Sequence, residues 1–347
     1  MVMYNNSTNF NASRGNLTDL RFNNNSFYDM LFTVSVTVHV LIAIGAVISN
    51  ILILGTIFTT PTLRRELCYL MVSSLAFGDL LLGLAVIPVY VDFTVNDKIT
   101  LGCEIHLILQ VFVIRGHVMI TNLGLLIINI VYIIKQYEYK IPHINQTTKL
   151  PVYIALSLVP WVAMLIVLPP LIKTGLHENI IKIWTATMCP LKVYKWAKVT
   201  LNILCYFAPL FGMIITTCII IYGFVAQGRG NIAFRPTLLN EEKPMFRPKF
   251  IIVANVLCLL LLLPEHIVQT FTLSENTRTL ITAKMFVFVL AASKGVALPV
   301  VWLLVPEVNE ALRERCSFSY WRTSPDAPQH VVNKTYKQFV RDAENTD

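Results

Sequence analysis

The chain has 347 residues, of which 55% are hydrophobic and 14% are charged, and its mean hydropathy is +0.62. Because soluble domains carry about 25% charged residues, this composition excludes an ordinary soluble domain and places the chain in a lipid bilayer. Basic residues outnumber acidic ones by 28 to 20, but they sit in short loops between apolar runs, which excludes a nucleic-acid-binding surface.

The N-terminal segment, residues 1–29, is polar and rich in asparagine. It lacks the basic and apolar regions of a cleavable signal peptide, so we expect the first span to act as its own insertion signal. Its Asn-x-Ser/Thr glycosylation sequons begin at Asn5, Asn6, Asn11, Asn16 and Asn24. An asparagine-rich segment also produces sequons by chance. Together with an odd number of spans, they predict a glycosylated, extracellular N-terminus on a multi-pass plasma-membrane protein.

Seven apolar runs follow, each long enough to cross the hydrocarbon core as a helix of about 20 residues. They cover residues 30–58, 68–92, 103–135, 150–173, 197–226, 248–272 and 282–305. Open strands in lipid would leave backbone groups unpaired, so we expect helices throughout. The sequence therefore predicts an all-α membrane protein, a seven-transmembrane helix bundle over residues 30–305.

Residues 306–316 predict a short amphipathic juxtamembrane helix. Val308, Ala311 and Leu312 fall on one side of it, and charged residues fall on the other. Cys316, at its end, is a candidate palmitoylation site.

The C-terminal tail, residues 317–347, is polar and is expected to be disordered. Lys and Arg are more numerous on its side of the bilayer than on the side of the N-terminus. This bias predicts a cytoplasmic C-terminus.

Several residues in the spans occur in a recognisable order. They are Asn50, Asp79, Cys103 and Trp161 in spans one to four, Cys189 in the second outer loop, and Pro209, Pro264 and Pro299 in spans five to seven. With this order and near-normal spacing, residues 30–316 resemble the rhodopsin-like family of G-protein-coupled receptors. The resemblance implies a cell-surface receptor for an extracellular ligand, with a heterotrimeric G protein among its cytoplasmic partners. It also implies a disulfide bond between Cys103 and Cys189, which we place on the oxidising side; the alternative is two free thiols.

The chain departs from this family where the family's signalling residues lie. The inner end of span three has an aliphatic run, residues 127–131, in place of a triplet containing arginine. Leu262 replaces an aromatic residue before Pro264, and Leu298 and Trp302 replace the asparagine and tyrosine around Pro299. The family's signalling mechanism therefore does not carry over residue by residue.

Lys294 is a further departure, because the family usually has a small polar residue at this position, near the carboxylate of Asp79. Ionisable side chains within spans face the bundle interior and form pairs. We therefore expect an internal ion pair between Asp79 and Lys294, with the ammonium in place of the sodium ion that this aspartate commonly helps to hold in the family. Ala292, not Lys294, occupies the position of the opsin lysine, which disfavours retinal. No cofactor or metal is expected, and the lone histidines, such as His117, are interpreted as satisfied core residues.

The candidate ligand-binding residues are Gln110, Glu265, His266 and Gln269. Gln110 stands where amine receptors of the family carry an aspartate, which disfavours a monoamine bound in the usual way. Glu265 pairs either with a cationic ligand group or with Arg115, and the alternative is an internal polar network without a ligand.

The charges counted inside the bundle balance, with Asp79 and Glu265 against Arg115 and Lys294. Such a pre-paired interior needs no charged ligand for neutrality.

A second hypothesis is a non-signalling seven-helix binding or scaffold protein that modulates another receptor by dimerising. The missing arginine favours it. A transporter lacks support because no hydropathy repeat is seen, and an enzyme is not expected because no catalytic motif occurs.

Overall fold

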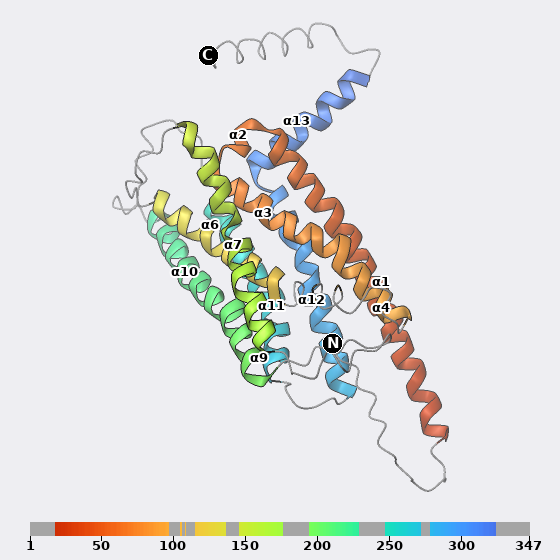
Figure 1. Cartoon of the computed structure of the whole chain (residues 1–347). Helices are drawn as coiled ribbons and strands as arrows, with labels where there is room; N and C mark the ends of the chain where they lie inside the picture. The colour runs from red at the N-terminus through yellow and green to blue at the C-terminus, as the bar shows by residue number, and fades with distance from the viewer. Residues whose placement is uncertain are drawn as a thin grey trace.

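The computed structural model describes residues 18–96, 105, 108, 115–136, 146–175, 194–228, 247–271 and 278–323. These residues form a bundle of long helices that run side by side (Figure 1). The predicted seven-transmembrane helix bundle is therefore correct.

The elements follow one another as helices joined by short turns or by segments outside the described residues. They are α1 (Thr18–Thr59), α2 (Pro61–Arg64), α3 (Leu67–Leu81), η1 (Leu82–Val86), α4 (Ile87–Asn96), α6 (His117–Gln136), α7 (Gln146–Gly175), α9 (Lys195–Asn202), η3 (Ile203–Phe207), α10 (Ala208–Gly228), α11 (Pro248–Phe271), α12 (Arg278–Leu303) and α13 (Pro306–Thr323).

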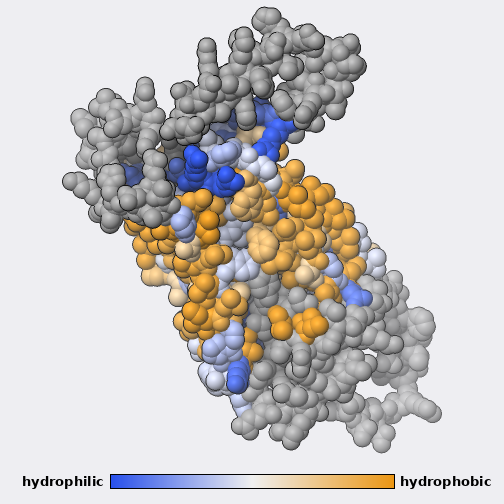
Figure 2. Space-filling model, turned by 45° about the horizontal axis from the view of Figure 1, so that its top comes forward, coloured by the Kyte–Doolittle hydropathy of each residue, from blue (hydrophilic) through white to orange (hydrophobic). Residues whose placement is uncertain are grey.

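Within the described residues, seven helical segments are long and apolar enough to cross a membrane. They are Met30–Thr59, Leu67–Asp92, His117–Gln136, Leu150–Thr174, Lys195–Ala226, Pro248–Val268 and Ala283–Leu303. These bounds agree closely with the predicted runs, except that most of the outer half of span three lies outside the described residues. The hydrophobic side chains cover the middle of the visible face, and hydrophilic ones gather toward its ends (Figure 2). This distribution matches a bilayer-spanning bundle.

The second and fifth spans each contain a π-helical turn, η1 and η3, that ends just before a proline. The backbone N–H of Ile87, before Pro88, donates to the carbonyl of Leu82, and that of Ala208, before Pro209, donates to the carbonyl of Ile203. A proline ring clashes with the carbonyl four residues earlier, and the wider π turn moves that carbonyl aside. The sequence showed the prolines but did not predict this extra residue per turn.

Polar side chains within the spans connect neighbouring helices. Asn50 Nδ2 donates to the carbonyl of Gly295 at 3.0 Å and so ties α1 to α12. Trp161 Nε1 donates to Ser74 Oγ at 2.9 Å, and Ser74 donates to the carbonyl of Ser157 at 2.8 Å, which ties α7 to α3. Since lipid provides little hydrophobic drive between helices, such bonds and close packing hold the bundle together.

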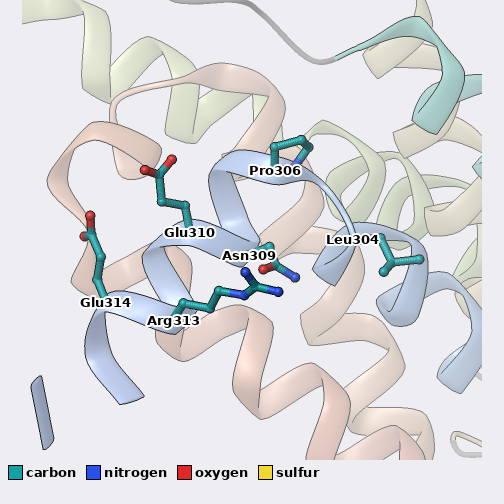
Figure 3. A pocket seen from close by; sticks show the side chains of 6 residues that line it. All are labelled: Leu304, Pro306, Asn309, Glu310, Arg313 and Glu314. Atoms are coloured by element: carbon teal, nitrogen blue, oxygen red, sulfur yellow. The ribbon is translucent and has the colours of Figure 1, made fainter. Parts of the chain in front are cut away.

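The predicted amphipathic helix exists as α13, with Val308 and Ala311 buried against the bundle. The side chains that line a surface pocket here are Leu304, Pro306, Asn309, Glu310, Arg313 and Glu314. In Figure 3, Glu310 and Glu314 project to the same side of α13, and Arg313 points toward Asn309. This charged outer side matches the predicted pattern.

Helix α13 is longer than predicted, because it continues to Thr323 instead of ending at Cys316. The sequence between the two residues contains no Gly or Pro, and Pro325 is the first residue that opposes continuation. Residues 317–323 are therefore helical and not a disordered tail. Cys316 lies within α13, but its side chain lies outside the described ones.

Helix α1 begins at Thr18, well before the predicted start of the first span. Of the predicted glycosylation sites, Asn24 lies in the helical backbone of α1, but its side chain is not among those described. Asn5, Asn6, Asn11 and Asn16 lie outside the described residues, so these sites remain predictions.

Candidate functional site

A charged cluster lies in the middle of the bundle, where α3, α6 and α12 meet. Lys294 Nζ lies 2.7 Å from Asp79 Oδ1, and the side chains are each 1% exposed. His117 Nε2 lies 2.6 Å from the same carboxylate oxygen. The structure thus forms the ion pair that the sequence predicts, and it adds a histidine that the sequence did not assign to the pair.

The hydrogen-bond roles in this cluster follow from the donors and acceptors present. A carboxylate only accepts, so His117 Nε2 carries a proton and donates it to Asp79. Lys294 donates to Asp79 and also to Thr121 Oγ1, at 2.7 Å. Thr121 in turn donates to the carbonyl of His117 at 2.9 Å. With His117 neutral, one carboxylate balances one ammonium, and the cluster is electrically neutral.

His117 confirms the sequence interpretation of a satisfied core residue, but its partners come from the tertiary structure. The sequence does not show that His117 of span three lies at the same level of the bundle as Asp79 and Lys294, because that depends on how the helices pack. A polar residue amid apolar ones in a span was the available signal, since such residues face the interior.

A second polar group lies around Arg115, toward the end of the bundle that the sequence predicts to be the outer one. Arg115 is 6% exposed and donates a hydrogen bond to Asn202 Oδ1. Asn202 Nδ2 donates to Thr270 Oγ1 at 3.1 Å, so polar contacts run from span three through α9 to α11. Glu265 is also buried and interacts electrostatically with Arg115. The sequence named Arg115 as one of two possible partners of Glu265, beside a cationic ligand group, and did not foresee the amide of Asn202.

His266, the neighbour of Glu265, is fully buried in α11. Its ring stacks on Tyr206, with the centroids 3.7 Å apart and an interplanar angle of 15°. Neither ring nitrogen of His266, nor the Tyr206 hydroxyl, has a hydrogen-bond partner among the described residues. Since buried polar atoms normally have partners, these three atoms are available to bind a ligand or water.

The other candidate site residues lie outside what the structure describes. Gln110 is one of them, as are Cys103 and Cys189, so the predicted disulfide bond is untested. Gln269 lies in α11, but its side chain is not among those described.

A third polar network lies toward the inner end, where α6, α10 and α11 meet. Asn129, which is fully buried, donates to Thr216 Oγ1 at 2.9 Å. Asn255 Nδ2 lies 2.9 Å from both Asn129 Oδ1 and Thr217 Oγ1. The sequence treated residues 127–131 as an aliphatic run and missed this network. Two asparagines in apolar spans were the signal that was available.

Within the described residues, no group of three or more His, Cys, Asp or Glu side chains is placed to hold a metal ion. The buried cluster brings together only Asp79 and His117 of these residue types, and Lys294 occupies the space beside them.

Comparison with known proteins adds no family assignment. No family model matches the chain, and no curated protein matches its sequence. What the fold defines is a class: a membrane protein whose described residues contain seven helices apolar enough to span a bilayer.

Proposed function

We propose that this protein is a cell-surface receptor of the rhodopsin-like type, which binds an extracellular ligand and acts on cytoplasmic partners. The observation that carries the proposal is the buried polar group around Arg115, Glu265 and His266, toward the outer end of a seven-helix bundle. Buried polar groups converging between helices are typical of ligand sites. The order of landmark residues from Asn50 to Pro299 supports the family.

The proposal includes a plasma-membrane location with the N-terminus outside, where the sequons accept glycans. It also includes palmitoylation of Cys316, at the inner membrane surface. In this orientation the group around Arg115 faces the extracellular side, and the Asn129 network faces the cytoplasm.

The Asp79–Lys294 pair takes the role that a sodium ion has in the family. Lys294 supplies a fixed positive charge 2.7 Å from the carboxylate, so no further cation is required for neutrality. Thermal stability should therefore not change when sodium is exchanged for a large organic cation at constant ionic strength.

Cys103 and Cys189 are expected to form a disulfide bond that ties the second outer loop to the start of span three. Cys103→Ala and Cys189→Ala should lower surface expression to similar degrees, because each removes the same link. Peptide mapping under non-reducing conditions checks the bond directly. Recovery of both residues as free thiols would contradict it.

The alternative is a seven-helix scaffold that modulates another receptor by dimerising. The observation that favours it is the inner end of α6, where fully buried Ile128 and hydrogen-bonded Asn129 replace the arginine-containing triplet. Neither residue provides the cation with which the family engages a G protein, and Lys135, in the last turn of α6, pairs with Glu66.

Nucleotide exchange on a panel of G proteins, in membranes containing this chain, separates the two functions. Exchange above that of membranes without the chain, either constitutive or raised by tissue extract, supports the receptor. Silence across the panel supports the scaffold, for which co-purification with another receptor is then the test.

The variant Ile128→Arg sharpens this experiment, because Ile128 is fully buried at the inner end of α6. It should create or raise basal exchange if the missing arginine is what limits coupling. Ile130→Arg is the matched control, since Ile130 is 41% exposed and faces away from the interior. Equal exchange by both variants at equal surface expression would place the defect elsewhere, with Leu298 and Trp302 the next residues to test.

A further inference from the structure

Three basic side chains gather toward the outer end of the bundle around one acidic side chain. Lys198 of α9 interacts electrostatically with both Arg115 and Lys284, and Lys284 comes from α12. Glu265 of α11 interacts with Arg115. This group, Arg115, Lys198, Lys284 and Glu265, has an excess of two positive charges among the described residues.

The sequence had counted a balanced interior and left out Lys198 and Lys284, which lie near the ends of their spans. The structure brings Lys198 within electrostatic range of both Arg115 and Lys284. Within the described residues, Lys198 therefore adds a positive charge near Arg115 that the sequence count left out, and Lys284 adds another beside Lys198.

The hydrogen bonds of the group fix its geometry. Lys198 and Asn202 lie one helical turn apart on the same face of α9. Asn202 accepts from Arg115 and donates to Thr270, so this face of α9 is turned toward α6 and α11. The hydrogen bond that Arg115 makes here goes to a neutral amide, which orients the guanidinium without neutralising its charge.

The stacked pair His266 and Tyr206 provides a second, independent observation. His266 lies near enough to Arg115 to interact with it electrostatically. Both of its ring nitrogens and the Tyr206 hydroxyl lack hydrogen-bond partners in the described part of the chain. Unsatisfied polar atoms beside a group with more positive than negative charges are a combination that a bound acidic group would satisfy.

We propose that this outer site binds the anionic group of the extracellular ligand, a carboxylate, sulfate or phosphate. Lys198 of α9 and Lys284 of α12 contact the anion. Arg115, which is more deeply buried, attracts it, and the guanidinium has several N–H donors that suit two acceptor oxygens. Glu265 keeps the site from accumulating a still larger positive charge. The inference rests on the proposed function for the identity of the site, and it names the chemical class of the ligand.

The test uses the full chain, purified in detergent micelles, with inorganic phosphate and pyrophosphate as probes. The midpoint of thermal unfolding is measured against chloride at constant sodium concentration and ionic strength. We expect both probes to raise the midpoint of the wild type, and pyrophosphate to raise it more. Lys198→Gln combined with Lys284→Gln should remove most of this increase.

Arg247→Gln combined with Lys249→Gln is the matched control, because it removes two exposed positive charges at the inner end of α11. It should keep the full increase. Glu265→Gln should enlarge the increase, since it adds one unit to the positive excess, and this variant keeps the test valid if the lysine variants fold poorly.

Three results would overturn the proposal. The first is that neither probe raises the unfolding midpoint of the wild type. The second is an equal rise in the Lys198→Gln, Lys284→Gln variant and in its control. The third is a rise of the midpoint with choline that Glu265→Gln abolishes. Because unfolding is measured without a G protein, anion binding in a chain that is silent in nucleotide exchange would reject the receptor function and keep the anion site. Nucleotide exchange in a chain that binds neither anion would support the receptor function and reject the anion site.

Discussion

Removing either charge of the Asp79–Lys294 pair should lower the free energy of unfolding by about 3–5 kcal/mol, because the remaining charge is then buried without its partner. The variants are Asp79→Asn and Lys294→Met, and both positions are 1% exposed. His117→Phe should have a smaller effect, about 1.5–3 kcal/mol, since it removes one hydrogen bond to a charged group and leaves the ion pair in place. Thermal or denaturant unfolding in detergent measures all three.

The double variant Asp79→Asn with Lys294→Met should recover part of the loss, because no buried charge is then left unpaired. Lys135→Met is a suitable control, since Lys135 pairs with Glu66 at 3.1 Å but the two side chains are 28% and 47% exposed. Exposed pairs contribute about 0–1 kcal/mol. Strict additivity in the double variant, or a control loss as large as that of Lys294→Met, would show that the interior pair does not have the role assigned to it.

Replacing Asn129 with leucine should lower the free energy of unfolding by about 1–2 kcal/mol, because interhelical hydrogen bonds in membranes contribute about 0.6 kcal/mol each. Asn129 joins α6 to Thr216 of α10 and to Asn255 of α11, and its loss leaves the buried Asn255 with fewer partners. The inner ends of the three helices should separate more easily. We therefore expect faster hydrogen exchange of backbone amides around residues 250–256 of α11.

Thr174→Val is the control for that measurement. The Thr174 hydroxyl donates to the carbonyl of Pro170 within α7, at an exposed site, and joins no two helices. It should change neither stability nor exchange in α11. If Asn129→Leu behaves like this control, the inner network does not hold the three helices together.

The sequence alone was sufficient for the spans and for the interior ion pair. Length and hydropathy define a bilayer-crossing helix, so the seven runs required no tertiary information. Asp79 and Lys294 were paired because charged side chains within spans form pairs, and because the resemblance to the receptor family places Lys294 near the carboxylate of Asp79. The helical spacing of apolar residues also predicted which side of α13 is buried. It did not predict that the helix continues to Thr323.

Other contacts depended on how each helix is rotated about its axis, which local sequence does not specify. A π turn inserts one extra residue and so rotates everything beyond it by about 100° relative to an unbroken helix. One such turn, η3, lies in the fifth span between Asn202 on one side and Thr216 and Thr217 on the other. For this reason the sequence could not place Asn202 against Arg115 and Thr216 against Asn129 within the same span.

The charge balance at the outer end was decided in the same way. Lys198 and Lys284 are ordinary flanking lysines in the sequence, because long basic side chains near span ends usually reach the membrane surface. Only the packing of the helices brings Lys198 of α9 within electrostatic range of Arg115 and of Lys284 of α12. The sequence by itself determined a seven-span membrane protein with one internal ion pair. The tertiary structure decided which polar groups meet, because electrostatic and hydrogen-bond energies depend on distances between helices and not on spacing along one chain.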